Sequence, residues 1–169
     1  MRSPSRTFAK IRLVFIIFLC ILFFFGGASC SSRDQTRCLA NVRFLWFALI
    51  EYLGDPQIRA KYPIPQGADP LKFVVQLQQR RVDLLRCPLD TKSPTGQSSY
   101  MTWDRENLLL LWDKRGAIKE DLPLIWEKEG NHGGKHWVHT FGGMELLSTA
   151  ALDSRLAKAR SALKRITSK

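Results

Sequence analysis

The sequence predicts an α+β fold in which helices pack on one antiparallel sheet of about four to five strands. Apolar residues recur at helical spacing over residues 35–53, and they do so again over residues 148–166. Between these segments, residues 99–147 hold short aromatic and aliphatic runs separated by turn residues. Helices on either side of a run of strands are typical of α+β domains.

The segment 35–53 is predicted to be the first helix of the folded domain. Its apolar residues recur every three or four positions: Cys38, Val42, Leu45, Trp46, Leu49 and Leu53. Phe44 and Phe47 widen this apolar surface, so we expect the helix to be buried on most sides. The Gly-Asp-Pro sequence at 54–56 is expected to end it.

A loop and a short helix are expected next. Residues 56–69 are rich in Pro and Gly, which favours a loop. Asp69 followed by Pro70 is typical of a helix N-terminus, and we expect a helix from there to about Gln79. Residues 82–87 are expected to be extended.

Short strands and a final helix complete the prediction. The strands are expected at 99–103, 108–112, 122–126, 135–141 and 144–147. Gly142 and Gly143 separate the last two, which favours a type I′ hairpin. The final helix, 148–166, has its basic residues away from one apolar stripe. That stripe consists of Leu152, Leu156, Ala159, Leu163 and Ile166.

Residues 1–30 have the pattern of an export signal. The apolar run from Leu13 to Phe25, which we expect to form an N-terminal hydrophobic helix, follows four positive charges, and small residues precede Cys30. The segment fits a retained signal anchor, a cleaved signal peptide, or a lipoprotein signal acylated at Cys30, because Gly27 to Cys30 is similar to a bacterial lipobox. In each case the membrane is a partner of the chain at some stage, and the domain faces the periplasm or cell exterior.

The net charge of +11 is concentrated at the two ends of the chain. A nucleic-acid-binding protein would spread its basic residues over a contact face, so no nucleic acid is expected as a partner. The sequence has no Cys-x-x-Cys pair and no Gly-rich phosphate loop, and we expect no cofactor. We divide the chain into the leader, 1–30, an α+β domain, 31–147, and a basic amphipathic helix, 148–169.

Cys38 and Cys87 are the cysteines of the exported domain. In an oxidising compartment they form either a single disulfide or two buried thiols. Both alternatives are open at this stage, because two cysteines in one sequence do not by themselves show a bond.

Three histidines, His132, His136 and His139, lie within eight residues of one another. Zinc could use three such ligands. Gly133 and Gly134 disfavour a helix here, and side chains alternate along a strand, so His136 and His139 should point to opposite faces. We therefore predict that the three do not bind a metal together and that the polar residues of this strand face outward.

Catalytic patterns are weak in this sequence. The acids Asp104, Glu106, Glu127 and Glu129 lie beside predicted strands, where we expect half-exposed carboxylates. No Gly-x-Ser-x-Gly sequence is present. These observations do not favour an enzyme, and no catalytic residue is assigned.

Five short motifs occur in order along residues 35–150. They are Cys38-Leu-Ala-Asn41 with Tyr52 beyond it, Tyr62-Pro63, Cys87-Pro88-Leu-Asp90, Ser99-Tyr100, and His132 followed after nine residues by Gly142-Gly143. In these motifs the chain resembles the pseudopilin-like proteins of bacterial type II secretion, specifically the family with a C-terminal signature of His, nine residues and Asp-Gly. Here Gly142 stands in place of the Asp.

The resemblance implies a pilin-like fold, a structural or interaction function, and pilin-like or secretion-system subunits as partners. It also implies a disulfide between Cys38 and Cys87, which occupy matching positions. The leader lacks an acid, and Gly26-Gly27 interrupts a continuous helix, so prepilin-type processing is not expected. The alternatives are an envelope lipoprotein, a ligand-binding module built on the same domain, or an enzyme.

Overall fold

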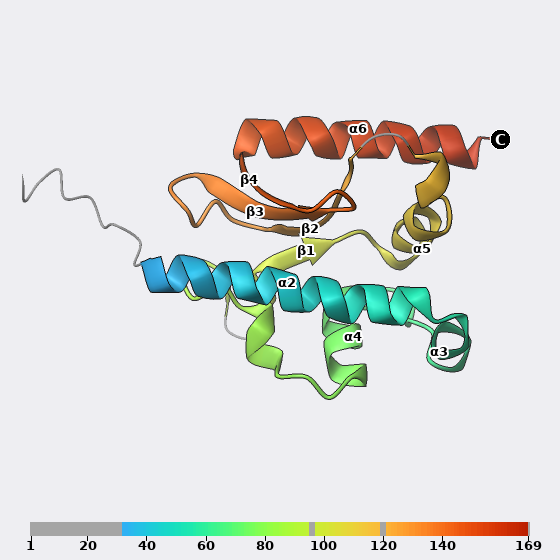
Figure 1. Ribbon diagram of the computed structural model, residues 1–169, viewed down its shortest axis with the longest axis horizontal. Helices are drawn as coiled ribbons and strands as arrows, with labels where there is room; N and C mark the ends of the chain where they lie inside the picture. Colours follow the sequence, from blue (N-terminus) through green and yellow to red (C-terminus); the bar gives the residue numbers. More distant parts are fainter. Residues whose placement is uncertain (1–31, 95–96, 119–120, 169) are drawn as a thin grey trace, which may run out of the picture. The chain divides into compact units, whose positions relative to one another are not determined.

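The computed structural model describes residues 32–94, 97–118 and 121–168, and within them helices cover both faces of an antiparallel sheet (Figure 1). The helices are α2 (Ser32–Gly54), α3 (Pro56–Lys61), α4 (Pro70–Leu77), η1 (Val82–Leu85), α5 (Arg105–Asp113), η2 (Arg115–Ala117) and α6 (Thr149–Thr167). The strands are β1 (Tyr100–Thr102), β2 (Pro123–Glu127), β3 (Lys135–Thr140) and β4 (Met144–Ser148). The predicted α+β class and C-terminal helix are confirmed.

The apolar leader falls outside the described residues, as does the hydrophobic N-terminal helix expected there. Among the residues that the structure describes, no helix combines the length and the apolar character needed to span a bilayer.

The sheet is a simple meander of four strands in the order β1-β2-β3-β4, and each neighbouring pair is antiparallel. Met101 pairs with Trp126, Trp126 with Val138, and Val138 with Glu145, so one residue position can be followed across the sheet. The pairing of β2 with β3 is irregular between Pro123 and Ile125. Four of the five predicted strands are therefore confirmed.

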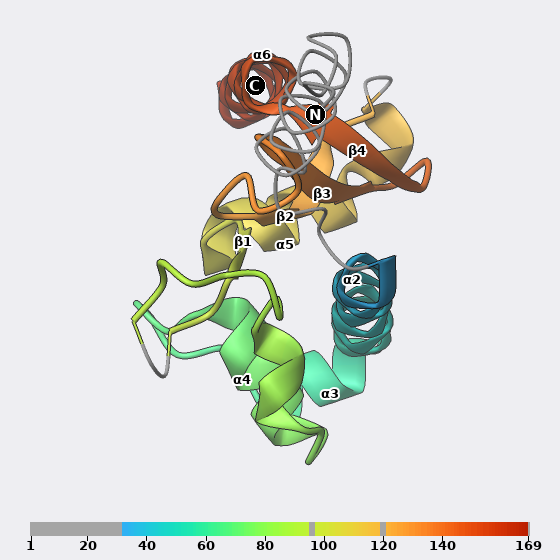
Figure 2. The same cartoon turned by 90° about the vertical axis from the view of Figure 1, so that its left-hand side faces the viewer.

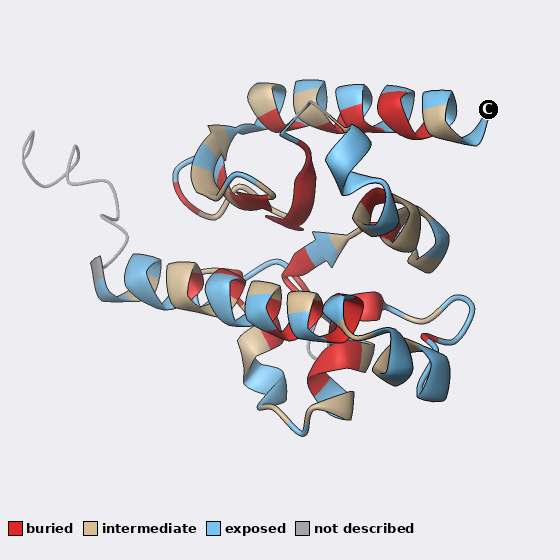
Figure 3. Ribbon diagram, turned by 45° about the vertical axis from the view of Figure 1, so that its right-hand side comes forward, coloured by how far each residue is buried: buried red, intermediate tan, exposed pale blue. Residues whose placement is uncertain are grey.

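Helix α2 packs on one face of the sheet and α6 on the other (Figures 1 and 2). Strand β3 shows this division, because His139 stacks on Trp46 of α2 while His136 contacts Thr149 at the start of α6. Figure 3 shows the buried positions of α6 on the side toward the sheet. They include four members of the predicted stripe: Leu152, Leu156, Ala159 and Leu163.

The predicted strand at 108–112 is wrong, because this segment belongs to helix α5. Asp104 caps the helix, and its side chain accepts a hydrogen bond from the Asn107 amide at 2.9 Å. Leu108 and Leu111, three residues apart, are its buried positions. A run of four leucines fits either periodicity, so the cap upstream decides between helix and strand.

Two further predictions for the first half of the chain are also wrong. The loop expected at 56–69 begins with helix α3, because Asp55 accepts hydrogen bonds from the Gln57 and Ile58 amides. The segment expected to be extended, 82–87, begins with the 3₁₀ helix η1.

The start of α4 at Asp69-Pro70 is confirmed. The Asp69 carboxylate accepts hydrogen bonds from the amides of Leu71 and Lys72, at 2.9 and 3.2 Å. The proline in the first turn costs no hydrogen bond there, because the amides of a first helical turn have no partner within the helix.

The hairpin between β3 and β4 is confirmed, but its turn is not of type I′. That turn requires positive φ at both central residues, and of the two glycines only Gly143 has one, at 140°. The Thr140 amide instead donates to the Gly143 carbonyl at 2.8 Å, so the two residues inside the turn are Phe141 and Gly142, and neither has a positive φ.

Candidate functional site

A disulfide joins Cys38, near the start of α2, to Cys87, just after η1. The two Cα atoms are 5.1 Å apart, and both residues are completely buried. This distance lies within the ordinary range for a disulfide. The pairing that the resemblance implied is therefore confirmed, and the alternative of two free thiols is not what the structure shows.

Glu127, the last residue of β2, lies completely buried beside this disulfide. One carboxylate oxygen is 3.1 Å from His132 Nε2, and the other accepts the Trp137 amide hydrogen at 2.9 Å. The prediction of a half-exposed carboxylate is wrong for Glu127. The protein accommodates the buried charge by giving each oxygen a hydrogen-bonding partner.

All three histidines are buried. The prediction that the polar residues of this strand face outward is therefore wrong for them. His136 Nδ1 donates to the Glu127 carbonyl at 3.0 Å, and Nε2 lies 2.9 Å from Thr149 Oγ1. His139 stacks on Trp46 with ring centres 4.3 Å apart, and burial lowers the pKa of His139. Each histidine therefore has its own structural contacts.

Four residues with metal-binding side chains come together at the disulfide: Cys38, Cys87, Glu127 and His132. Their sulfur, carboxylate and imidazole atoms all lie within 4.8 Å of one another, and all four residues are buried. We call these four residues the buried cluster. The two sulfurs are bonded to each other and the carboxylate contacts the imidazole, so all four side chains make contacts within the fold.

Two further residues of the five motifs, Asn41 and Tyr100, lie beside the buried cluster, whereas Tyr52 lies toward the other end of α2 and donates to the Tyr62 carbonyl at 3.0 Å. Tyr100 is the direct strand partner of Glu127, and burial together with the nearby Glu127 charge raises the pKa of Tyr100. Asn41 Nδ2 donates to the carbonyl of Arg86, the residue before Cys87, at 2.9 Å. Asn41 thus ties α2 to the segment that carries Cys87.

Asp90 organises the turn that follows Cys87 and Pro88. Its carboxylate accepts hydrogen bonds from the amides of Lys92 and Ser93, at 3.0 and 2.9 Å, and the residue is buried. Burial acts to raise the pKa of Asp90, but the neighbouring Ser93 and Ser99 side chains and the two amides outweigh it and lower the pKa to about 2.

We expect Asp90→Ala to lower the free energy of unfolding at pH 7 by about 1–2 kcal/mol, through loss of these hydrogen bonds. The Asp90 pKa is lowered on folding, so its contribution is complete above about pH 4 and is lost as the pH falls toward 2. Urea unfolding from pH 7 to pH 2 should show the difference shrink over that range. Asp153→Ala, at an exposed position on α6, is the control and should change little.

Gly142 and Gly143 lie apart from the buried cluster, in the turn at the opposite end of β3. The Gly142 amide donates to Asp121 at 2.9 Å, and Thr140 Oγ1 donates to the same carboxylate at 2.8 Å. A Cβ atom on Gly142 would lie 3.0 Å from that carboxylate. An acid at 142, as in the family signature, would therefore meet Asp121, whose carboxylate already serves this turn.

Glu127 is the member of the cluster that the sequence analysis missed. Its strand, Pro-Leu-Ile-Trp-Glu, is buried at every position and so lacks the alternation that marks a half-exposed strand. An acid ending an uninterrupted apolar run was the signal that could have identified it. Cys30, the candidate lipidation site, lies outside the described residues.

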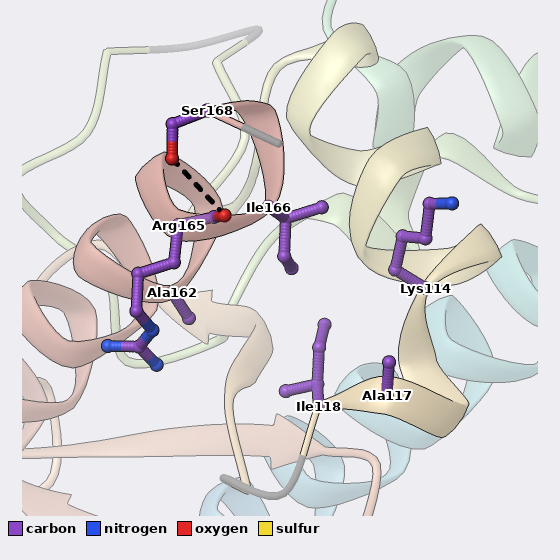
Figure 4. A pocket seen from close by; sticks show the side chains of 7 residues that line it. All are labelled: Lys114, Ala117, Ile118, Ala162, Arg165, Ile166 and Ser168. Atoms are coloured by element: carbon purple, nitrogen blue, oxygen red, sulfur yellow. Dashed lines mark hydrogen bonds between the residues drawn. The ribbon is translucent and has the colours of Figure 1, made fainter.

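A pocket lies elsewhere, between the end of α6 and the segment after α5 (Figure 4). Its volume is about 480 Å³. The lining residues are Lys114, Ala117, Ile118, Ala162, Arg165, Ile166 and Ser168. No acid or histidine lines this pocket, so it brings together no acid–base pair.

No protein-family model matches the chain, and neither does any curated protein or solved structure. The resemblance to pseudopilin-like proteins therefore depends on the five sequence motifs alone.

Proposed function

We propose that this protein is a membrane-tethered, extracytoplasmic structural and interaction protein of the pseudopilin-like kind. It would bind further copies of itself, as a subunit of a pilus-like or type II secretion assembly. Three features support the proposal: the export pattern of the leader, the five motifs, and a disulfide typical of oxidising compartments.

The observation that carries the proposal is the outer face of α2. This helix was expected to be buried on most sides, yet Phe44 is 48% exposed and Phe47 is 55% exposed. The helix is buried along one side only, where Val42, Leu45 and Leu49 pack into the core. Two large aromatic side chains are thus exposed on the surface, although the same helix contributes other side chains to the hydrophobic core.

A shallow hollow of about 290 Å³ accompanies the two phenylalanines. The outer face of α2 is defined here by the residues that line it: Thr36, Leu39, Ala40, Arg43, Phe44 and Phe47. Small and aliphatic side chains beside two exposed rings allow ring-into-hollow packing between two copies of the same helix. Copies tethered in one membrane would meet at a high effective concentration, so a small contact suffices.

The interior of the domain supports a structural rather than a catalytic function. The acid and histidine of the buried cluster contact each other, and Asp90 is used by its own turn. A general acid or base must reach a substrate. These groups are instead held by hydrogen bonds within the protein, and burial keeps a substrate from them.

The proposal is tested with the full-length chain in membranes, using a short amine- or carboxyl-reactive cross-linker. The protein should remain in the membrane fraction after a high-salt wash and yield cross-linked dimers and larger species. Phe44→Ser/Phe47→Ser should weaken this association roughly tenfold or more, because each ring loses its apolar contact. Folding should be unaffected, since both side chains are about half exposed.

The matched control is Val82→Ser/Met101→Ser, which changes two other exposed apolar side chains, 60% and 42% exposed. It should leave cross-linking unchanged. Cross-linking that survives the α2 changes, or falls equally in the control, would contradict the role of this face. A soluble product beginning near Ser31 would contradict the tether.

A further inference from the structure

The buried cluster has the composition of a metal site. Cys38 and Cys87 supply two sulfurs, Glu127 a carboxylate oxygen and His132 an imidazole nitrogen, all within 4.8 Å of one another. Two sulfurs, one nitrogen and one oxygen form a ligand set suited to zinc, which binds four such atoms in a tetrahedron. None of the four side chains needs to be recruited from the surface, because all are buried at this point.

The distances fit a tetrahedron with small adjustments. Bonds of about 2.0–2.1 Å to nitrogen and oxygen place those two ligand atoms about 3.3 Å apart. His132 Nε2 and Glu127 Oε1 are already 3.1 Å apart. The other Glu127 oxygen is held by the Trp137 amide, which leaves Oε1 as the oxygen available to a metal. The sulfurs must separate, since two sulfurs on one zinc lie about 3.7 Å apart.

We propose that reduction of the Cys38–Cys87 disulfide converts the buried cluster into a zinc site. A phosphine gives two electrons to the S–S bond, which breaks to leave two thiols. The disulfide is thus the oxidant, and one water molecule supplies the oxygen atom of the phosphine oxide and the two protons on the sulfurs. Zinc then displaces both protons and binds the two thiolates, Glu127 and His132. Disulfide and zinc exclude each other, so the oxidised protein has no site here.

The consequence concerns the chain before its disulfide forms. In a reducing environment zinc would hold α2 beside the segment after η1, in the arrangement that the disulfide later fixes. The metal would also keep Cys38 and Cys87 from reacting with other thiols. This inference does not rest on the proposed function, because it concerns residues inside the domain and not the outer face of α2.

The test uses the full-length protein in mild detergent, with Co²⁺ as a spectroscopic substitute for Zn²⁺. After reduction by a phosphine, the protein should bind one Co²⁺ with tetrahedral and sulfur-to-cobalt absorption bands, and Zn²⁺ should remove both. Metal analysis after gel filtration should give one zinc per reduced chain and none per oxidised chain. Zinc should also protect Cys38 and Cys87 of the reduced protein from alkylation, whereas Cys20 and Cys30 lie outside the buried cluster. This measurement requires no variant.

Two variants test the ligand set. His132→Gln and Glu127→Gln should each weaken Co²⁺ binding tenfold or more, whereas His139→Gln, at a buried histidine outside the cluster, should not. The proposal is overturned if reduced protein binds no Co²⁺, folded or not, or if oxidised protein binds equally well. Equal weakening of Co²⁺ binding by His139→Gln would also overturn the proposal, because His139 stacks on Trp46 and is not part of the buried cluster.

Discussion

Replacing both cysteines, in Cys38→Ala/Cys87→Ala, is expected to lower the free energy of unfolding by about 4 kcal/mol. The bond joins residues 49 positions apart, and closing a loop of that length removes much of the conformational freedom of the unfolded chain. Domains of this size are typically stable by about 5–15 kcal/mol, so the loss is a large share of the total. Urea unfolding of the oxidised protein and the variant, followed by circular dichroism, measures it.

Wild-type protein reduced without metal is the control for this prediction. It lacks the bond but keeps both sulfurs, so it should unfold close to the double variant. If the oxidised wild type and the double variant unfold at the same urea concentration, the disulfide does not stabilise the fold by restricting the unfolded chain. A variant far less stable than reduced wild type would instead attribute the loss to packing around the sulfurs.

His132→Ala is expected to lower the free energy of unfolding by about 3 kcal/mol at pH 7. Glu127 is completely buried, and the imidazole is the partner of one of its oxygens at 3.1 Å. Removing the ring leaves that oxygen without a hydrogen bond and opens a cavity beside it. Chemical unfolding of the oxidised variant at pH 7 provides the measurement.

Glu127→Gln is the companion variant. The glutamine side chain is neutral, has nearly the same shape as glutamate, and can still accept the hydrogen of the Trp137 backbone amide. Glu127→Gln should therefore lower the free energy of unfolding by less than His132→Ala does. If His132→Ala stays within 1 kcal/mol of wild type, the carboxylate does not depend on the imidazole. If Glu127→Gln is the worse of the two, the negative charge itself contributes more than the partner does.

Much of the fold followed from local patterns. The core positions of α2, the start of α4 and four of the five predicted strands could be predicted, because spacing and capping residues report on the chain near them. The same rules failed at 108–112, where an unbroken leucine run carries no period of its own. They also wrongly predicted that Phe44 and Phe47 are buried, because hydrophobicity alone does not show which side of a helix the rest of the chain covers.

The site was predictable only in part. The motifs identified Cys38, Cys87 and His132, and the resemblance paired the two cysteines. Glu127 escaped because its partners come from elsewhere: the imidazole from the following turn and the amide from β3. Nothing local marks an acid as buried when its hydrogen bonds are made by residues that only the folded chain brings to it.

The position of the disulfide also sets how the domain carries mechanical load. Cys38 lies close to the N-terminal end of α2, and only Ser32–Arg37 precede it within the helix. Tension applied through the N-terminal end of the chain passes from Cys38 directly to Cys87 and then into the sheet. The residues between them, which include most of α2 and all of α3, α4 and η1, stay outside the line of force. A force applied at that end can therefore unfold only the first six residues of α2 before the disulfide bears the load.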